Sequence, residues 1–144
     1  MNWLLFAAGA ALCMALYNLL IKAAAGHIHE MVGAVVLQVV AAVTGAALLL
    51  LLHLRGVLPP SLYTGRGLVL AAAAGAGIGV AEILTFVVYG RGAPASVGTP
   101  LIVGGSVLLT AVLGVAVLRE ALGWPQALGM VLVVAGIALL ARGH

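Results

Sequence analysis

Five apolar stretches, each long enough to cross a lipid bilayer as a helix, fill most of this 144-residue chain. They extend approximately over residues 3–24, 32–54, 68–89, 94–118 and 124–141. A helix needs about 20 apolar residues to cross the hydrocarbon core, and the backbone groups of a span in lipid must be hydrogen-bonded within helices. Since 65% of the residues are hydrophobic and only 6% are charged, we predict an all-α integral membrane protein. Residues 1–144 would form one transmembrane domain of five helices.

The connections between these stretches are short and hold no extramembrane domain that could carry chemistry. The first stretch lacks a basic flank, so we expect it to be a span and not a cleaved signal peptide. We find no nucleophile motif, phosphate-binding loop or zinc motif and therefore expect neither an enzyme nor a cofactor. The basic residues are few and separated along the chain, which argues against a nucleic-acid partner. Membrane lipid and a small-molecule substrate are the expected partners.

The six basic residues are divided equally between the two sides of the membrane that five spans would cross. The side of the amino terminus holds Arg55, Arg66 and Arg119, and the other side holds Lys22, Arg91 and Arg142. An excess of Lys and Arg on one side normally fixes the orientation of a membrane protein. The equal division therefore favours insertion in both orientations, although a short chain can also reach such a balance by chance.

Several polar side chains lie inside the predicted spans, mostly on narrow helical faces. Asn18 follows Met14 by four residues in the first span, and Gln38 shares a face with small residues in the second. Thr99 and Ser106 lie on one face of the fourth span. Each of these side chains alone is commonly explained by hydrogen bonds between helices or to its own backbone. Together they suggest a cavity, and we consider Asn18, Gln38, Thr99 and Ser106 candidate substrate-binding residues.

Glu82 is the one acidic residue well inside a span, about 10 Å from the Tyr89 end of the third helix. Its helical face also carries Thr85 and Tyr89, which we include among the candidate substrate-binding residues. Placing a carboxylate in hydrocarbon costs about 2.5 kcal/mol or more, which favours uptake of a proton. Glu82 is therefore a candidate for proton coupling. The alternative is a structural carboxyl that is held neutral, or paired with Arg91 or a hydroxyl, and that locks the bundle.

Glycines at close-approach spacing indicate where helices pack. Gly75 and Gly79 are four residues apart in the third span, and Gly129 and Gly136 lie in the fifth.

A small cluster of His27, His29 and Glu30 lies between the first two spans. Its spacing matches no established metal site, so we expect solvated side chains and no bound metal.

The carboxyl-terminal half carries motifs of a known family in residues 89–100, 118–129 and 136–140. They include a small residue followed by Ser96-x-x-x-Pro100 at the start of the fourth span, Glu120 after that span, and Gln126-x-x-Gly129 at the start of the fifth. These segments resemble an EamA-type half of the drug/metabolite transporter superfamily. Members mostly contain two such five-helix halves, the second inverted relative to the first.

The resemblance implies a transporter of small solutes that works by alternating access. With one half only, the chain would need an inverted second copy, as an antiparallel homodimer, or a paralogue. The resemblance also implies a multi-pass protein of a bacterial or archaeal inner membrane.

The last two spans are also similar to those of the small multidrug resistance proteins, which are antiparallel dimers of four-helix chains. Their key glutamate lies eight residues before a lysine in the first helix. Counted back from Lys22, that position holds Met14 in this chain. Glu82 would therefore have to replace the missing acid, or transport would be uncoupled.

Two functions remain open at this point. The first is export of a small metabolite or amphiphilic compound by an antiparallel dimer, with proton coupling through Glu82. The second is a noncatalytic membrane subunit that packs through its glycine seams against a larger transporter or lipid-processing complex.

Overall fold

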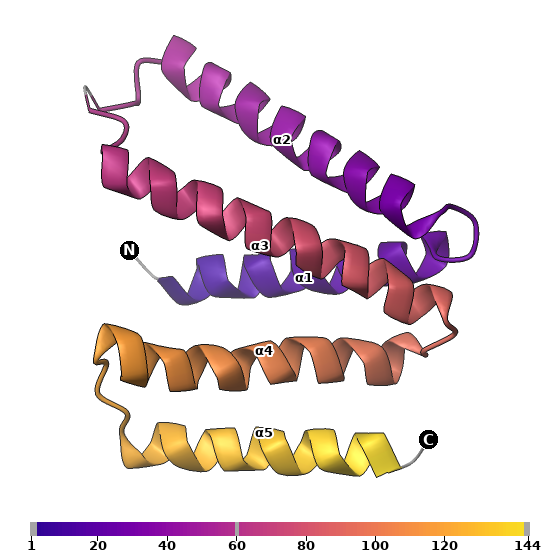
Figure 1. Ribbon diagram of the computed structural model, residues 1–144. Coiled ribbons are helices and arrows are strands. Elements are labelled where there is room, and N and C mark those ends of the chain that lie inside the picture. Colours follow the sequence, from indigo (N-terminus) through magenta and orange to yellow (C-terminus); the bar gives the residue numbers. More distant parts are fainter. Residues whose placement is uncertain (1–2, 60, 143–144) are drawn as a thin grey trace. The chain divides into compact units, whose positions relative to one another are not determined.

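The computed structural model describes residues 3–59 and 61–142, and all regular secondary structure in these ranges is α-helical (Figure 1). The five helices are α1 (Trp3–Ala24), α2 (Glu30–Leu54), α3 (Gly65–Gly90), α4 (Ala95–Leu118) and α5 (Trp124–Arg142). The all-helical fold is confirmed, and each helix begins and ends within three residues of its predicted bounds. Two compact units divide the chain, one with most of α1 together with α4 and α5, the other with α2 and α3. One domain over residues 1–144 stays a prediction.

The helices have the length and the surface of membrane spans. In the described residues, α1 to α4 are long and apolar enough to cross a bilayer, and the apolar part of α5, Trp124–Leu140, is shorter. At 19 residues, the whole of α5 still extends over about 28 Å, close to the thickness of the hydrocarbon core. Large apolar side chains on all the helices are exposed, for example Leu5, Leu70 and Val131. Such a surface is stable only in contact with lipid or another apolar partner.

Helix ends are determined by local backbone chemistry. The Nδ1 atom of His29 accepts a hydrogen bond of 3.3 Å from the N–H of Met31 and so caps the start of α2. At the end of α4, Arg119 adopts a left-handed backbone with φ of 56°, and the N–H of Glu120 bonds the carbonyl of Gly114 at 3.1 Å. This pairing satisfies a carbonyl that the end of a helix would otherwise leave without a partner.

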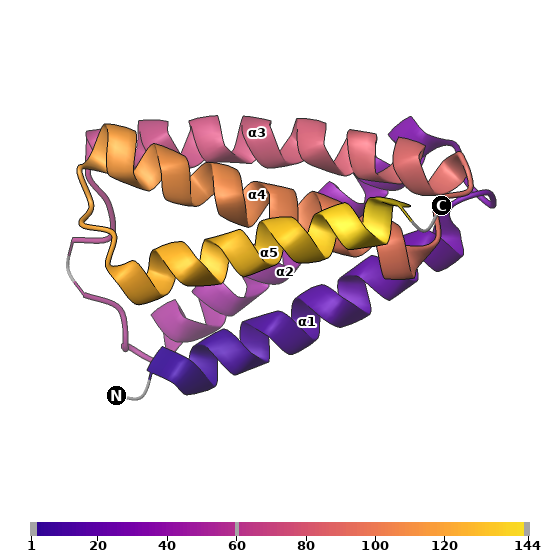
Figure 2. The same cartoon turned by 90° about the horizontal axis from the view of Figure 1, so that it is seen from below.

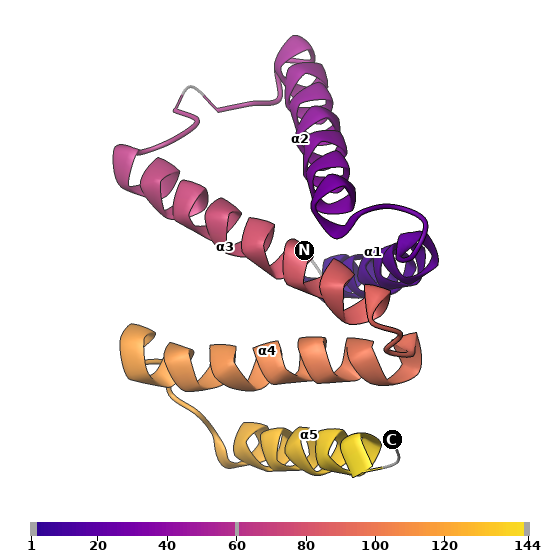
Figure 3. The ribbon, with the colours of Figure 1, turned by 45° about the vertical axis from the view of Figure 1, so that its right-hand side comes forward.

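The hairpin of α2 and α3 is packed at one end and splayed at the other. Figures 1 and 3 show the two antiparallel helices closest where α2 begins and α3 ends, and apart toward the connection near residue 60. At the close end, a Cβ on Gly33 would lie 2.7 Å from Cε1 of Phe86, so only glycine fits there. Ala34, next to it, is fully buried. Small residues on α2 thus let the Phe86 ring approach the backbone.

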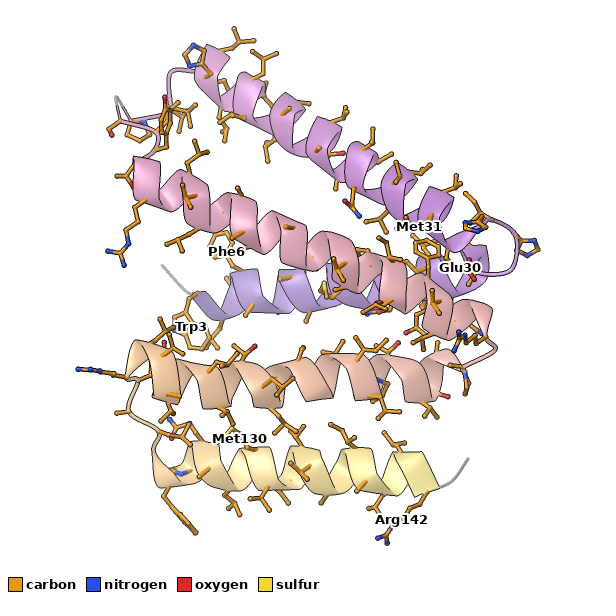
Figure 4. All side chains as sticks on the ribbon, viewed as in Figure 1. Trp3, Phe6, Glu30, Met31, Met130 and Arg142 are labelled. Carbon is orange, nitrogen blue, oxygen red and sulfur yellow. The ribbon has the colours of Figure 1, made fainter. Side chains whose placement is uncertain are left out.

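Helices α4 and α5 form a second antiparallel hairpin and lie side by side in Figures 1 and 2. A Cβ on Gly104 would lie 2.6 Å from Cδ1 of Ile137, which marks the close approach of these two helices. Arg142 extends from the C-terminal end of α5 on the side away from α4 (Figure 4). The side of α5 that packs on α4 carries apolar residues such as Ile137. The charge of Arg142 lies outside this helix contact.

Candidate functional site

A buried polar face on the last turns of α3 contains three of the predicted residues. Glu82, Thr85 and Tyr89 follow the helical spacing of three and four and are 5%, 6% and 2% exposed. The hydroxyl of Thr85 donates a hydrogen bond of 2.8 Å to the carbonyl of Ala81, one turn earlier. This face lies in the half of α3 that packs against α2, and the spacing along α3 places the carboxyl, hydroxyl and phenol groups on it.

Gln38 extends this face from the neighbouring helix. Its Nε2 atom donates a hydrogen bond of 3.4 Å to the carbonyl of Gly79 on α3. Gly79 precedes Glu82 by three residues and lies on the same helical face. Gln38 therefore contacts α3 at the start of the face that carries Glu82, Thr85 and Tyr89, within the α2–α3 unit.

The acidic residue at the start of α2 lies beside the end of α3. The Oε1 atom of Glu30 would be 3.3 Å from a Cβ on Gly90, and its Oε2 atom is 3.9 Å from Nε2 of His29. His29 is largely exposed. Among residues 3–59 and 61–142, no three His, Cys, Asp or Glu side chains form a group that could hold a metal ion.

The second unit contains an open cavity of about 430 Å³ between α1 and the start of α4. Its lining includes Asn18 and Thr99, two predicted residues, and Ser96, which sequence reasoning left out of the site. Asn18 is 6% exposed, and its Nδ2 atom donates a hydrogen bond of 2.8 Å to the carbonyl of Met14. The amide is thus held in place by its own helix.

Another open cavity, of about 360 Å³, lies between α4 and α5. Its lining is almost entirely apolar and consists of Thr99, Pro100, Val103, Gly104, Val133, Gly136, Ile137 and Leu140. Thr99 and Pro100 also line the α1–α4 cavity. The two cavities therefore adjoin each other along α4.

The surroundings of the other predicted residues, Ser106 and the four glycines, differ from one residue to the next. Ser106 is exposed, and its hydroxyl bonds the carbonyl of Val103 at 2.8 Å, a bond to its own helix. Gly79 contacts Gln38 within the chain, whereas a Cβ at Gly75, Gly129 or Gly136 would meet no atom of the described residues within 4 Å. Packing at these three glycines stays a prediction about a partner outside the chain.

Sequence reasoning missed the residues that build the helix contacts. Phe86 and the pair Gly33 and Ala34 form the close end of the α2–α3 hairpin. The sequence signals that could have predicted this contact were the aromatic Phe86 near the Glu82 face and the two adjacent small residues, Gly33 and Ala34, on α2. Pro100 and Ser96 were visible as part of the motif at the start of α4, but their place in a cavity depends on α1, which is far away in sequence.

Fold and surface define the class of this protein as a multi-pass helical membrane protein. A profile of the EamA-like transporter family matches residues 1–142. The chain therefore belongs to the EamA-like transporter family, whose members are membrane transporters, and the predicted resemblance is confirmed. Searches of curated proteins and of solved structures find no match.

Proposed function

We propose that two copies of this chain, inserted in opposite orientations, export a small metabolite or amphiphilic compound by alternating access. Family membership makes the chain a transporter by class. Five spans place the two termini on opposite sides of a membrane, so an inverted second copy supplies the second half that larger relatives contain in one chain. The equal division of six basic residues supports insertion in both orientations.

The observation that carries the proposal is the buried carboxyl of Glu82 on a membrane-spanning helix. Glu82 is 5% exposed and lies eight residues before the end of α3, about 12 Å from it. An ionisable group at such depth is costly in hydrocarbon and marks a pathway for ions, protons or substrate. We propose that Glu82 exchanges a proton during transport, with Gln38, Thr85 and Tyr89 around it. Asn18, Thr99 and Ser106 complete the candidate substrate contacts.

A noncatalytic membrane subunit is the second candidate. The open space at Gly75, Gly129 and Gly136 favours it, because these glycines offer backbone surface to a partner helix. The same surface also suits a second copy of the chain, so the glycines alone do not separate the two functions. The proposed location is the inner membrane of a bacterium or archaeon.

Reconstitution of the purified chain separates the candidates. Liposomes that contain the protein and an internal pH-sensitive dye are given a pH gradient and a panel of small metabolites and amphiphiles. We expect at least one compound to cause proton flux above that of protein-free liposomes. If none does, and activity appears only after a second membrane protein is added, the chain is a subunit.

A further inference from the structure

The residue that caps the start of α2 is a histidine, a side chain that gains a proton on mild acidification. Its acceptor is the Nδ1 atom of His29, which bonds the N–H of Met31 at 3.3 Å. Met31 is the second residue of α2, where the helix itself offers no carbonyl to that N–H. A neutral imidazole has one ring nitrogen that accepts, whereas both nitrogens of an imidazolium are donors. Protonation of His29 therefore breaks this cap.

The charges at this helix end act in the same direction. The dipole of α2 opposes a positive charge at its first turn. The Nε2 atom of His29 lies 3.9 Å from Oε2 of Glu30, and an imidazolium attracts this carboxylate more strongly than a neutral ring does. Since Nδ1 of the imidazolium no longer accepts, this attraction holds the ring near Glu30 without restoring the bond to the N–H of Met31.

Other titratable groups belong to the elements around this helix end. His27 lies in the connection that precedes α2. Glu82 and Tyr89 lie buried on α3, the helix that packs against the start of α2. Along the chain, the basic residues next to this hairpin are Lys22 and Arg91. Variants must therefore separate a response of His29 from a response of these groups.

The first turn of α2 also holds the packed end of the α2–α3 hairpin. The carbonyl of His29 accepts a hydrogen bond of 2.9 Å from the N–H of Gly33, the glycine on which the Phe86 ring packs. Glu30, in the same turn, lies against Gly90 at the end of α3. The turn thus meets α3 at two positions that are four residues apart. Toward residue 60 the two helices diverge (Figure 3), so these contacts join them at one end only.

We propose that protonation of His29 opens the first turn of α2 and thereby loosens the packed end of the α2–α3 hairpin. The half of α3 at this end carries the buried face of Glu82, Thr85 and Tyr89. Mild acidification then makes this face more accessible. Opening of this kind requires no gradient, substrate or second copy of the chain, so it is separate from the proposed transport.

Backbone amide hydrogen exchange of the full chain in lipid nanodiscs, measured by NMR at about pH 7.5 and about pH 5.5, tests the proposal. Each rate is divided by that of an unstructured peptide at the same pH, because exchange itself depends on pH. We expect the protection of Met31 to fall about fivefold on acidification, the effect of losing a helix cap. Residues 86–90 should lose protection in parallel, whereas residues 46–52, in the other half of α2, should not. Unchanged protection of Met31, or a loss there with none at residues 86–90, would overturn the proposal.

Two histidine variants identify the group that takes up the proton. His29→Asn keeps a preferred cap residue that cannot be protonated, so we expect the difference between the two pH values to disappear. His27→Asn is the matched control, because His27 lies two residues earlier and does not cap α2. It should keep the fivefold change. An unaltered pH response in His29→Asn would assign the response to another group, such as Glu82, and overturn the proposal. His29→Ser, with another preferred cap residue, gives the same test if His29→Asn does not fold.

The exchange experiment and the transport assay have independent outcomes. A chain that opens at this end on acidification but moves no compound overturns the proposed function and leaves the pH response of α2. A chain that transports while the protection of its first α2 turn ignores pH overturns the role of His29 alone.

Discussion

The Nε2 atom of Gln38 lies 3.4 Å from the carbonyl oxygen of Gly79 and donates a hydrogen bond to it across the α2–α3 hairpin. The bond depends on the absence of a side chain at Gly79, since a Cβ there would lie 3.2 Å from Oε1 of Gln38. An amide on one helix and a glycine on the next thus fix the approach of two spans. The polar face of Glu82 begins one turn further along α3.

We expect Gly79→Ala to weaken this contact, because the added methyl group displaces the Gln38 amide. The matched control is Gly75→Ala, one turn earlier on α3, where a Cβ meets open space. Both variants gain the same helix propensity, so the difference between their unfolding free energies isolates the contact. A hydrogen bond between membrane helices contributes about 0.6 kcal/mol on average, and we expect a difference near that value. Equal stability in denaturant titration of detergent-solubilised protein would contradict it.

A larger effect is expected at the close end of the hairpin. Gly33→Ala places a methyl group 2.7 Å from Cε1 and 2.8 Å from Cζ of Phe86, and the aromatic ring cannot bend away. Overpacking of this kind costs about 1–3 kcal/mol. Phe86→Leu should relieve the clash, so the double variant should be less destabilised than the sum of the two single variants. Gly45→Ala, at an open position of α2, is the control. If the changes in unfolding free energy of the two single variants simply added in the double variant, the two residues would not interact.

Glu82→Gln tests the proton role. The amide keeps the shape of the carboxyl but cannot take up or release a proton. We expect transport by the unaltered chain to accelerate when the side that receives the substrate is made more acidic, because proton movement down the gradient drives export. In the variant, the rate should no longer depend on the gradient. Glu30→Gln is the control, since Glu30 lies at the start of α2 and its side chain is 38% exposed. If the transport rate of Glu82→Gln still depended fully on the pH gradient, the Glu82 carboxyl would have a structural role and no role in proton coupling.

Because the six basic residues are divided equally between the two sides, we expect a single charge change to alter the ratio of the two membrane orientations. Arg119→Gln leaves two basic residues on the amino-terminal side against three on the other, and Arg142→Gln does the reverse. Because the more basic side stays in the cytoplasm, the two variants should shift the orientation in opposite directions. A cysteine introduced near the carboxyl terminus and labelled from each side measures the ratio. If the unaltered chain and both variants share one orientation, the second half must come from an oppositely inserted paralogue.

Part of the candidate site could be predicted from the sequence because helical periodicity is a local property. The spacing of Glu82, Thr85 and Tyr89 places them on one face of any α-helix, and all three are buried. The spacing of Thr99 and Ser106 is equally regular, yet Thr99 lines two cavities while Ser106 bonds its own backbone. Periodicity groups residues on a face but does not say what that face meets.

The sequence by itself determined the class of protein, the five helices and their approximate ends, because an uninterrupted apolar run of about 20 residues has the length of a membrane-spanning helix, which satisfies its own backbone in lipid. It also identified the Glu82 face and the motifs of the family. Only the tertiary structure decided that Phe86 packs on Gly33, that Gln38 reaches Gly79, and that Ser96, Asn18 and Thr99 share a cavity. These relationships join residues on different helices. Their distances depend on how helices pack, which the spacing within one helix does not determine.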